Sequence, residues 1–323
     1  MSRKIALPVW ELTLVLMVIA AGAWSSTLSE YYLSVDQIFG STRFFIIPGL
    51  MALGLAMVVS TGEIDISLAS TIAVGTVTLS KLAAFGVPAP IAIVVVVVVG
   101  CLCGLINGLL VARWKLPSLA VTLGTMGAFR GFAFIVGSEV GYTDFSDAYL
   151  YTGSEYVFAG IVPVSLFVFL AAALVVAFVM HRTIFGRQCF SIGLNADAAW
   201  YAGVDIVRTK ILTYVAAGAL SALASVVWIG QYGSARGDNA DGSILFVVTA
   251  VVLGGVDING GRGTIGGVVL ALCLLGTIRN GMGLANIGGP SQTVVLGALL
   301  VAGVLRPVLA AAVLKLARRP RAA

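Results

Sequence analysis

The sequence predicts an all-α fold: one polytopic membrane domain, residues 1–323, built as a bundle of about ten transmembrane helices. Of its residues, 59% are hydrophobic and only 10% are charged, whereas a soluble domain averages about 25% charged residues. The apolar runs are also long and continuous, as in the stretch from Ile91 through Gly100 to Val111. Spanning helices need about 20 apolar residues, while a membrane barrel shows alternating segments of about 10. A helical bundle in lipid follows.

Apolar runs separated by polar breaks define the individual spans. An even number of spans places both termini on the same side of the membrane. The predicted spans are residues 7–28, 44–61, 66–85, 90–112, 118–137, 159–180, 210–230, 243–257, 264–281 and 290–311.

Basic residues predict which side faces the cytoplasm. In the ten-span arrangement, twelve of them fall on one face, which the positive-inside rule assigns to the cytoplasm. The protein is therefore expected in the bacterial inner membrane with both termini cytoplasmic. This also explains the formal charge of +5 better than nucleic-acid binding does, because the basic residues do not line one face with interleaved aromatics. They are Arg3, Lys4, Arg113, Lys115, Arg182, Arg187, Arg208, Lys210, Lys315, Arg318, Arg319 and Arg321.

Two loops are long enough to meet another protein. Residues 138–158 contain four acidic residues, four tyrosines and no Lys or Arg, so we expect this loop in the periplasm, either as a partner contact or as a connector with an aromatic belt. Residues 181–210 form the only long cytoplasmic loop. Within it, Asn195 is a good N-cap for a short Ala-rich helix that includes Ala198 and Ala199, which suits docking of a partner.

The sequence motifs that would indicate catalysis, a cofactor or a metal are either absent or occur without the secondary structure and the neighbouring residues that they require. Residues 261–266 match GxGxxG, but no acidic residue follows Asp257 and no βαβ unit surrounds them. The chain has no GxxxxGK[ST] loop, one histidine, His181, and four cysteines without metal-ligand spacing. We therefore expect no enzyme activity, no cofactor, no metal, and ATP hydrolysis, if any, on a separate chain.

Two segments interrupt the apolar pattern near membrane level, residues 61–67 and 254–264. They share the spacing G-x-[IV]-D-I-[SN], which includes Asp65 in the first and Asp257 and Asn259 in the second. Glycines loosen a helix and a carboxylate near lipid is costly, so these can be helix breaks that line or gate a pathway, with Glu63 beside Asp65. The alternative is that each is a tight turn whose Asp caps the next helix.

Arg130 lies in the middle of the predicted span 118–137. An unpaired guanidinium costs several kcal/mol at that depth. We therefore expect it to face the bundle interior and to pair with a carboxylate, with Glu63 or Asp65 as candidates; direct contact with substrate is the alternative.

These segments resemble a known family: the permease subunits of bacterial ABC importers for ribose, xylose, arabinose, rhamnose and autoinducer-2, in the branched-chain permease superfamily. The resemblance runs from Ile46 to Leu305. It rests on Gly-Glu-Ile-Asp-Ile-Ser at 62–67, Asn-Gly-Leu-Leu-Val at 107–111, Val-Thr-Leu-Gly-Thr at 121–125, Arg-Gly at 130–131 and Val-Leu-Gly-Gly at 252–255.

The resemblance implies a non-catalytic subunit that moves a monosaccharide, a pentose or hexose such as rhamnose, or autoinducer-2. It further implies an ABC ATPase, a second permease, identical or homologous, and a periplasmic sugar-binding protein as partners. The ATPase-docking residues it implies are Gly186, Arg187, Ile192, Gly193, Asn195, Ala198, Ala199 and Gly203.

Two observations bear on specificity and on the rival function. Glu63 stands where many members of the family carry Gly, and residues 233–238 look closer to the rhamnose and autoinducer-2 branches. The rival is a secondary transporter or channel driven by an ion gradient, which would use buried acidic residues. Its candidates are Glu11, Glu63, Asp65 and Asp257.

Overall fold

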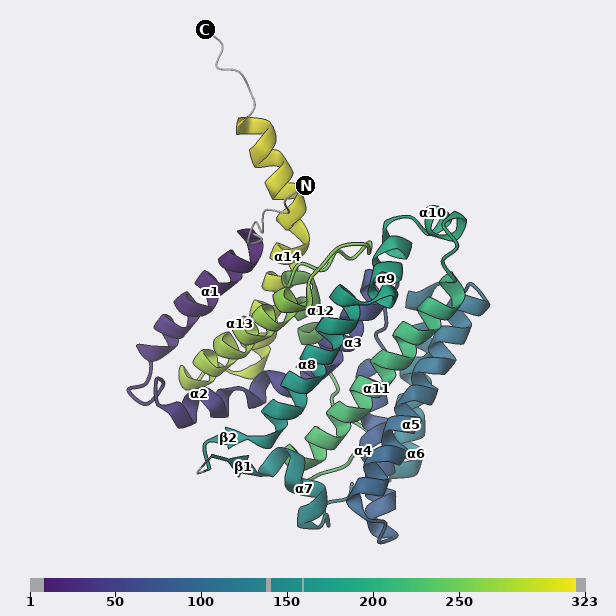
Figure 1. The fold of residues 1–323 in the computed structure, drawn as a ribbon. Coiled ribbons are helices and arrows are strands. Elements are labelled where there is room, and N and C mark those ends of the chain that lie inside the picture. Colours follow the sequence, from purple (N-terminus) through teal and green to yellow (C-terminus); the bar gives the residue numbers. More distant parts are fainter. Residues whose placement is uncertain (1–8, 138–140, 159, 318–323) are drawn as a thin grey trace.

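The computed structural model describes residues 9–137, 141–158 and 160–317, and these form a bundle of α-helices (Figure 1). The elements are α1 (Val9–Ser26), α2 (Val35–Ser41), α3 (Arg43–Ser60), α4 (Leu68–Ala84), α5 (Ala89–Gly108), the π-helix η1 (Leu109–Arg113), α6 (Ser118–Gly137), α7 (Asp147–Ser154), β1 (Tyr156–Val157), β2 (Val162–Pro163), α8 (Val164–Arg182), α9 (Ile184–Leu194), α10 (Ala196–Tyr201), α11 (Ile206–Tyr232), α12 (Ser243–Leu253), α13 (Ile265–Leu284) and α14 (Gly289–Ala317).

Helix length and apolarity confirm the predicted membrane bundle. Within the described residues, seven helical segments are long and apolar enough to cross a membrane: α1, α2 with α3, α5 with η1, α6, α8, α11 and α13. The other apolar helices, α4, α12 and the part of α14 up to Leu305, are shorter. The 11 residues of α12 rise only about 16 Å, half of a hydrocarbon core of about 30 Å. The structure therefore has an apolar helix at every predicted span, but it does not establish a count of ten.

The long helix α11 is the centre of one half of the bundle, where it packs against α5, α3, α4 and α7 (Figure 1). Its contact with α5 is close because α5 presents glycines. A Cβ on Gly104 would lie 2.1 Å from the carbonyl oxygen of Tyr214, and one on Gly100 would lie 2.4 Å from that of Gly218. Small residues that let backbones approach are a common means of joining helices in lipid.

The other half of the bundle contains α1, α12, α13 and α14, and α3 joins the two halves. α1 packs on α13, α12 packs on α14, and α3 contacts α11 on one side and α12 and α13 on the other. Nearly every side chain of α3 from Phe45 to Ser60 is buried. α3 is thus the core helix of the molecule, although it ends at the first break.

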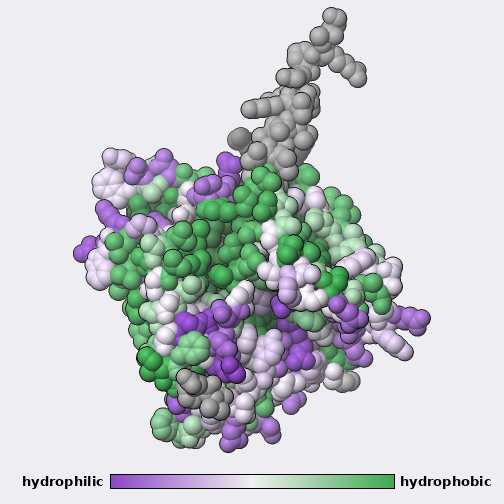
Figure 2. Space-filling view, turned by 180° about the vertical axis from the view of Figure 1, so that it is seen from behind, coloured by the Kyte–Doolittle hydropathy of each residue, from purple (hydrophilic) through white to green (hydrophobic). Residues whose placement is uncertain are grey.

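The bundle has two distinct ends (Figure 1). One, here called the α10 end, carries α9, α10, the start of α1 and the last turn of α14. The opposite end, the α7 end, carries α2, α7 and the antiparallel pair β1–β2, in which Tyr156 pairs with Pro163. On the face seen in Figure 2, apolar residues cover much of the upper half, and hydrophilic residues gather lower down, towards the α7 end.

Two predicted boundaries differ from the structure. The span predicted at 159–180 begins as a helix only at Val164, because Val162 and Pro163 pair with β1. The loop predicted at 181–210 contains a helix that was missed, α9, as well as the expected α10. Three residues of α9 at a spacing of three, Gly186, Cys189 and Ile192, are buried, so α9 packs one face on the bundle. Of the basic residues used for orientation, Arg3, Lys4, Arg318, Arg319 and Arg321 lie outside the described residues.

Candidate functional site

The first break, residues 61–67, holds a buried carboxylate. Asp65 is 1% exposed, and its Oδ1 accepts hydrogen bonds from the Ser67 N–H at 2.9 Å and the Ser67 hydroxyl at 2.6 Å. Asn107 of α5 donates to the Ser67 Oγ at 2.8 Å and lies 3.5 Å from Asp65 Oδ2. Burial raises the pKa of Asp65, and the hydrogen bonds from Ser67 and Asn107 oppose that shift. This carboxylate fastens the break to α5.

The second break, residues 254–264, contains the same local turn. Asp257 Oδ1 accepts from the Asn259 N–H at 3.0 Å and from Asn259 Nδ2 at 3.2 Å. In both breaks, therefore, the carboxylate binds the backbone N–H two residues further on, which defines an Asx turn. The alternative that each Asp caps the next helix is wrong, because the N-cap residues are Ser67 for α4 and Thr264 for α13, whose Oγ1 accepts from the Gly267 N–H at 3.0 Å. The shared spacing is a structural repeat of a turn.

The two breaks meet each other and α9 at one place, here called the three-way junction: Ser60 and Gly62, Gly260 and Gly261, and Gly193. The Gly261 N–H donates to the Ser60 carbonyl at 2.9 Å. A Cβ on Gly193 would lie 2.2 Å from both of those atoms, and one on Gly260 would lie 2.6 Å from the nitrogen of Gly62. Three stretches of backbone therefore touch with no side chain between them, and α9 is in direct contact with both breaks.

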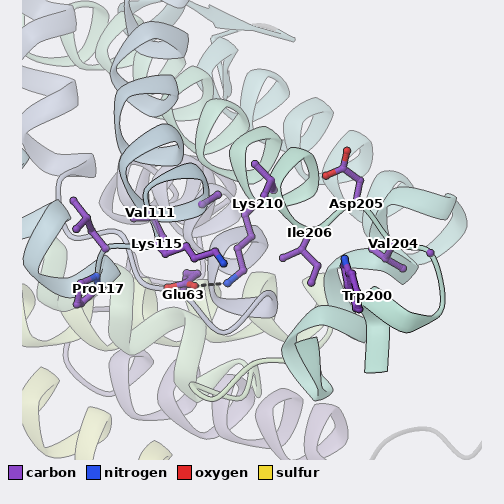
Figure 3. A pocket seen from close by; sticks show the side chains of 13 residues that line it. Glu63, Val111, Lys115, Pro117, Trp200, Val204, Asp205, Ile206 and Lys210 are labelled. Carbon is purple, nitrogen blue, oxygen red and sulfur yellow. Dashed lines mark hydrogen bonds and ion pairs between the residues drawn. The ribbon is translucent and has the colours of Figure 1, made fainter. Parts of the chain in front are cut away.

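Glu63 forms an ion pair with Lys210 of α11, and the two side chains are only 18% and 16% exposed. The pair lies at the edge of a cavity of about 780 Å³ at the α10 end, together with Lys115, Trp200 and Ile206 (Figure 3). On the same break, the Ile64 carbonyl accepts from the Tyr214 hydroxyl at 3.2 Å. The first break is thus fastened to α11 as well as to α5.

Arg130 does not pair with Glu63 or Asp65, so that prediction is wrong. Its guanidinium donates to the carbonyls of Gly237 at 2.9 Å and Asn239 at 2.7 Å, and it lies 3.8 Å from the carboxylate of Asp241. The Asp241 side chain is 81% exposed. Arg130 therefore has a carboxylate partner, but an exposed one, and its hydrogen bonds go to backbone carbonyls.

Those carbonyls belong to residues 233–242, here called the inserted loop, which connects α11 to α12. Arg130 lies seven residues before the end of α6, about 10 Å along the helix axis, so the loop enters the bundle. Asn239, 5% exposed, donates to the Thr76 hydroxyl at 3.1 Å. Irregular backbone at membrane depth needs such partners because no water is available there. The loop also explains why α12 is short.

The structure thus divides the five predicted pathway residues between the two ends. Glu63, Asp65, Asp257 and Asn259 lie in the breaks that meet at the α10 end, and Arg130 holds the inserted loop towards the α7 end. The sequence analysis missed Asn239 and Thr76. The three glycines of the loop, at 233, 237 and 242, were the available signal for irregular backbone.

The predicted docking residues lie on α9 and α10. Asn195 Oδ1 accepts from the Ala198 N–H at 2.9 Å, so the predicted N-cap is confirmed. Arg187 and Ala198 are exposed, whereas Ala199 is 4% exposed and packs within this chain. A Cβ on Gly186 would meet the Met180 carbonyl at 2.0 Å, so Gly186, like Gly193, is needed for close packing. Of this set, Arg187, Asn195 and Ala198 have exposed side chains, and that of Asn195 is used for the cap.

The acidic residues considered for a rival ion pathway have separate partners in the part of the chain that the structure describes. Glu11 accepts from the Thr264 hydroxyl at 2.6 Å, Glu63 pairs with Lys210, and the carboxylates of Asp65 and Asp257 close their own turns. None of the four is hydrogen-bonded to another within the described ranges.

A helical bundle with interrupted helices and a polar network at membrane depth is typical of transport proteins. The chain belongs to the family described as "branched-chain amino acid transport system / permease component", which matches residues 37–304. This confirms the permease family to which the sequence motifs pointed. No solved structure matches the chain.

Among curated proteins, the chain is similar to autoinducer 2 import system permease proteins. LsrD of Salmonella typhimurium (strain LT2) is 35% identical over 296 residues, which cover 90% of this chain and 89% of the relative. LsrD of Escherichia coli O9:H4 (strain HS) is 35% identical over 296 residues, 90% of each chain. These relatives favour the permease of an ABC importer over the ion-gradient transporter or channel.

Proposed function

We propose that this chain is the membrane-spanning permease subunit of an ATP-driven importer for autoinducer-2 or a related sugar-like solute, with a pentose or hexose such as rhamnose as the next candidates. One observation carries the proposal: proteins 35% identical over nine-tenths of both chains are autoinducer-2 import permeases. The permease supplies a gated path and performs no covalent chemistry. ATP is hydrolysed by a separate chain.

In the membrane, we place ten spans, with α4, α12 and α14 completing the seven longer segments, and both termini in the cytoplasm. Arg113, Arg182 and Arg208 support this orientation, since they lie at the ends of η1 and α8 and the start of α11, all at the α10 end. The α10 end is then cytoplasmic and the α7 end periplasmic. The start of α1 and the end of α14 lie together at the α10 end, as an even number of spans requires (Figure 1).

The α10 end is the docking surface for the ATPase in this proposal. Large apolar side chains are exposed there outside the spans: Ile184 at 66%, Leu194 at 62%, Trp200 at 63% and Tyr201 at 82%. Between α9 and α10 lies a groove of about 480 Å³ lined by Arg187 and Ala198 among others. Exposed apolar residues around a groove are typical of protein interfaces. The three-way junction lies directly beneath α9, so movement of the ATPase would reach both breaks.

The remaining partners are a second permease, identical or homologous, and a periplasmic solute-binding protein at the α7 end. Glu63, Asp65, Asp257 and Asn259 would control the cytoplasmic side of the path by holding the two breaks. Arg130 would control the periplasmic side by holding the inserted loop.

Uptake of labelled autoinducer-2 tests the function. Cells that express the permease with its ATPase and binding protein should take it up, and deletion of the ATPase should abolish uptake while a protonophore that leaves ATP intact should not. Uptake that stops with the protonophore and survives loss of the ATPase would favour the ion-gradient alternative.

Docking is tested at Ala198, which is exposed. We expect Ala198→Trp to weaken co-purification of the ATPase and to abolish uptake at normal membrane levels, while the matched control Ala198→Ser leaves both unchanged. If the Trp variant keeps its ATPase and its uptake, the docking surface lies elsewhere.

A further inference from the structure

A second cavity, of about 460 Å³, lies among α3, α11, α12, α13 and α14 towards the α7 end. Its volume falls within the range of about 300–1,000 Å³ that is usual for small-molecule sites. The side chains that matter here are Arg43, Trp228, Tyr232, Asp241, Arg279 and Gln292.

The two arginines are unexpected at this end of the molecule. In the proposed orientation the α7 end is periplasmic, where the positive-inside rule disfavours Lys and Arg. Arg43 is held by the Tyr156 hydroxyl at 3.3 Å and the Gln231 carbonyl at 3.5 Å. Arg279 makes no hydrogen bond or ion pair with any residue that the structure describes, and its side chain lines the cavity. The positive-inside rule does not account for Arg279, and because this residue is exposed its guanidinium is available to a solute in the cavity.

Aromatic rings line one side of the cavity, and one polar group each of the cavity residues Trp228 and Phe44 lacks its usual hydrogen-bond partner among the described residues. The rings of Trp228 and Tyr232 lie 4.5 Å apart at 48°. The Trp228 Nε1–H is buried and has no acceptor among the described residues, an arrangement that native proteins avoid. On α3, Pro48 has no N–H, so the carbonyl of Phe44 loses its helical partner, and both residues line the cavity.

We propose that this cavity binds a small polyhydroxylated, sugar-like solute within a single permease subunit. A hydroxyl both donates and accepts hydrogen bonds, so a ring that carries several needs donors and acceptors together. Arg279 supplies donors, Asp241 supplies an acceptor, and Gln292 supplies both. Trp228 and Tyr232 supply an apolar face with polar edges, which suits the C–H face of such a ring. A lipid chain or an apolar peptide would leave these polar groups unpaired.

Asp241 connects this cavity to the inserted loop. It lines the cavity and lies 3.8 Å from Arg130, which holds the loop carbonyls. A solute bound to Asp241 therefore contacts the inserted loop, which lies within the bundle towards the α7 end. This binding site rests on the proposed function and adds to it a place where the solute binds on the periplasmic side of the permease.

Binding is measured on the full-length permease in lipid nanodiscs, by tryptophan fluorescence and by calorimetry, with synthetic autoinducer-2, D-ribose and L-rhamnose as probes. We expect saturable binding of at least one probe. Arg279→Gln and Gln292→Leu should each weaken it about tenfold, as loss of a hydrogen bond that involves a charged or buried group does. Trp228→Phe should remove most of the fluorescence change. The control Arg113→Gln, an exposed arginine at the opposite end, should leave binding unchanged.

The outcomes separate this site from the proposed function. If no probe binds saturably, or if both cavity variants insert normally and bind as the wild type does, the site is overturned even where cells import the solute. If binding is saturable and sensitive to Arg279→Gln and Gln292→Leu, the site stands, even where ATPase-dependent uptake fails and the proposed function falls.

Discussion

The two breaks share a turn but differ in their surroundings. Asp65 and Asp257 both accept a hydrogen bond from the backbone N–H two residues on, at 2.9 Å and 3.0 Å. Asp65 is 1% exposed, however, whereas the turn of Asp257 and Asn259 is open to solvent. The same spacing therefore produces the same local backbone, and the packing decides what the carboxylate does.

The consequence is a difference in attachment. Side chains fasten the first break to α5 through Asn107 and to α11 through the pair of Glu63 and Lys210. The turn of the second break is closed by its own residues. This break is linked to the first by the backbone contact at the three-way junction and to α1 by the hydrogen bond from Thr264 to Glu11. A segment with fewer buried side-chain contacts opens at lower free energy. The turn of Asp257, which has no buried side-chain partner from another helix among the described residues, is therefore expected to open at lower free energy than the turn of Asp65.

The largest effect is expected at the junction, where both breaks meet. In Gly193→Ala, the new Cβ would lie 2.2 Å from backbone atoms of Ser60 and Gly261, which cannot move aside as a flexible side chain can. We expect a loss of about 3 kcal/mol or more in stability, seen as a lower melting temperature of the purified permease, and loss of uptake.

The matched control is Gly124→Ala. A Cβ there has nothing within 4 Å, and Ala in a helix is more favourable than Gly by up to about 1 kcal/mol. Its melting temperature should be equal to or above that of the wild type. A stable, active Gly193→Ala variant would show that the junction tolerates separation.

Removing each carboxylate tests the difference in burial directly. Asp65→Leu leaves the Ser67 N–H and the Ser67 hydroxyl without their acceptor in a buried site, at a cost of about 1–3 kcal/mol for each unpaired group. Asp257→Leu exposes the freed N–H of Asn259 to water and should cost under about 1 kcal/mol. Thermal unfolding of both variants measures the difference between their losses of stability. Equal losses would mean that the two turns bear equally on stability.

The ion pair that distinguishes the first break is tested by a double-mutant cycle. Glu63→Gln or Lys210→Met leaves a largely buried charge unpaired, which costs up to about 3 kcal/mol, whereas the double variant removes both charges. We expect the double variant to be more stable than either single one. Additive losses would show that the two side chains do not act together.

Much of the fold follows from the sequence because lipid enforces one rule, that spans are long and apolar. The span predicted at 118–137 coincides with α6, and Asn195 caps α10 as expected. The inserted loop and α9 were not predicted. The loop is stabilised by Arg130 and Thr76, which lie more than 100 residues away in the chain, and a single sequence does not show which distant residues meet.

The surroundings of several predicted site residues differ from those that the sequence led us to expect. Arg130 was expected to pair with Glu63 or Asp65, but its carboxylate neighbour is the exposed Asp241, and its hydrogen bonds go to carbonyls of irregular backbone, a partner that composition does not reveal. Ala199 was expected at the docking surface but fills the interface between α10 and the bundle, since a six-residue helix turns successive residues to different sides. The cavity near the α7 end could not be predicted from the sequence, because residues of five helices that are far apart in the chain line it.

The smallest expected effect is a pH dependence confined to the first break. Because burial raises the pKa of Asp65 above its value in the unfolded chain, the folded chain holds this proton more tightly. The resulting stabilisation is fully present below the unfolded pKa of about 3.9 and is lost as pH rises through the folded pKa. The melting temperature of the wild type relative to Asp65→Asn should therefore increase as pH is lowered from neutral through the folded pKa. Asp257→Asn makes the same substitution in the turn of the second break and serves as the control. If Asp65→Asn and the wild type keep a constant difference in melting temperature over this range, the carboxylate does not titrate there, and the contrast between the two breaks lies in packing alone.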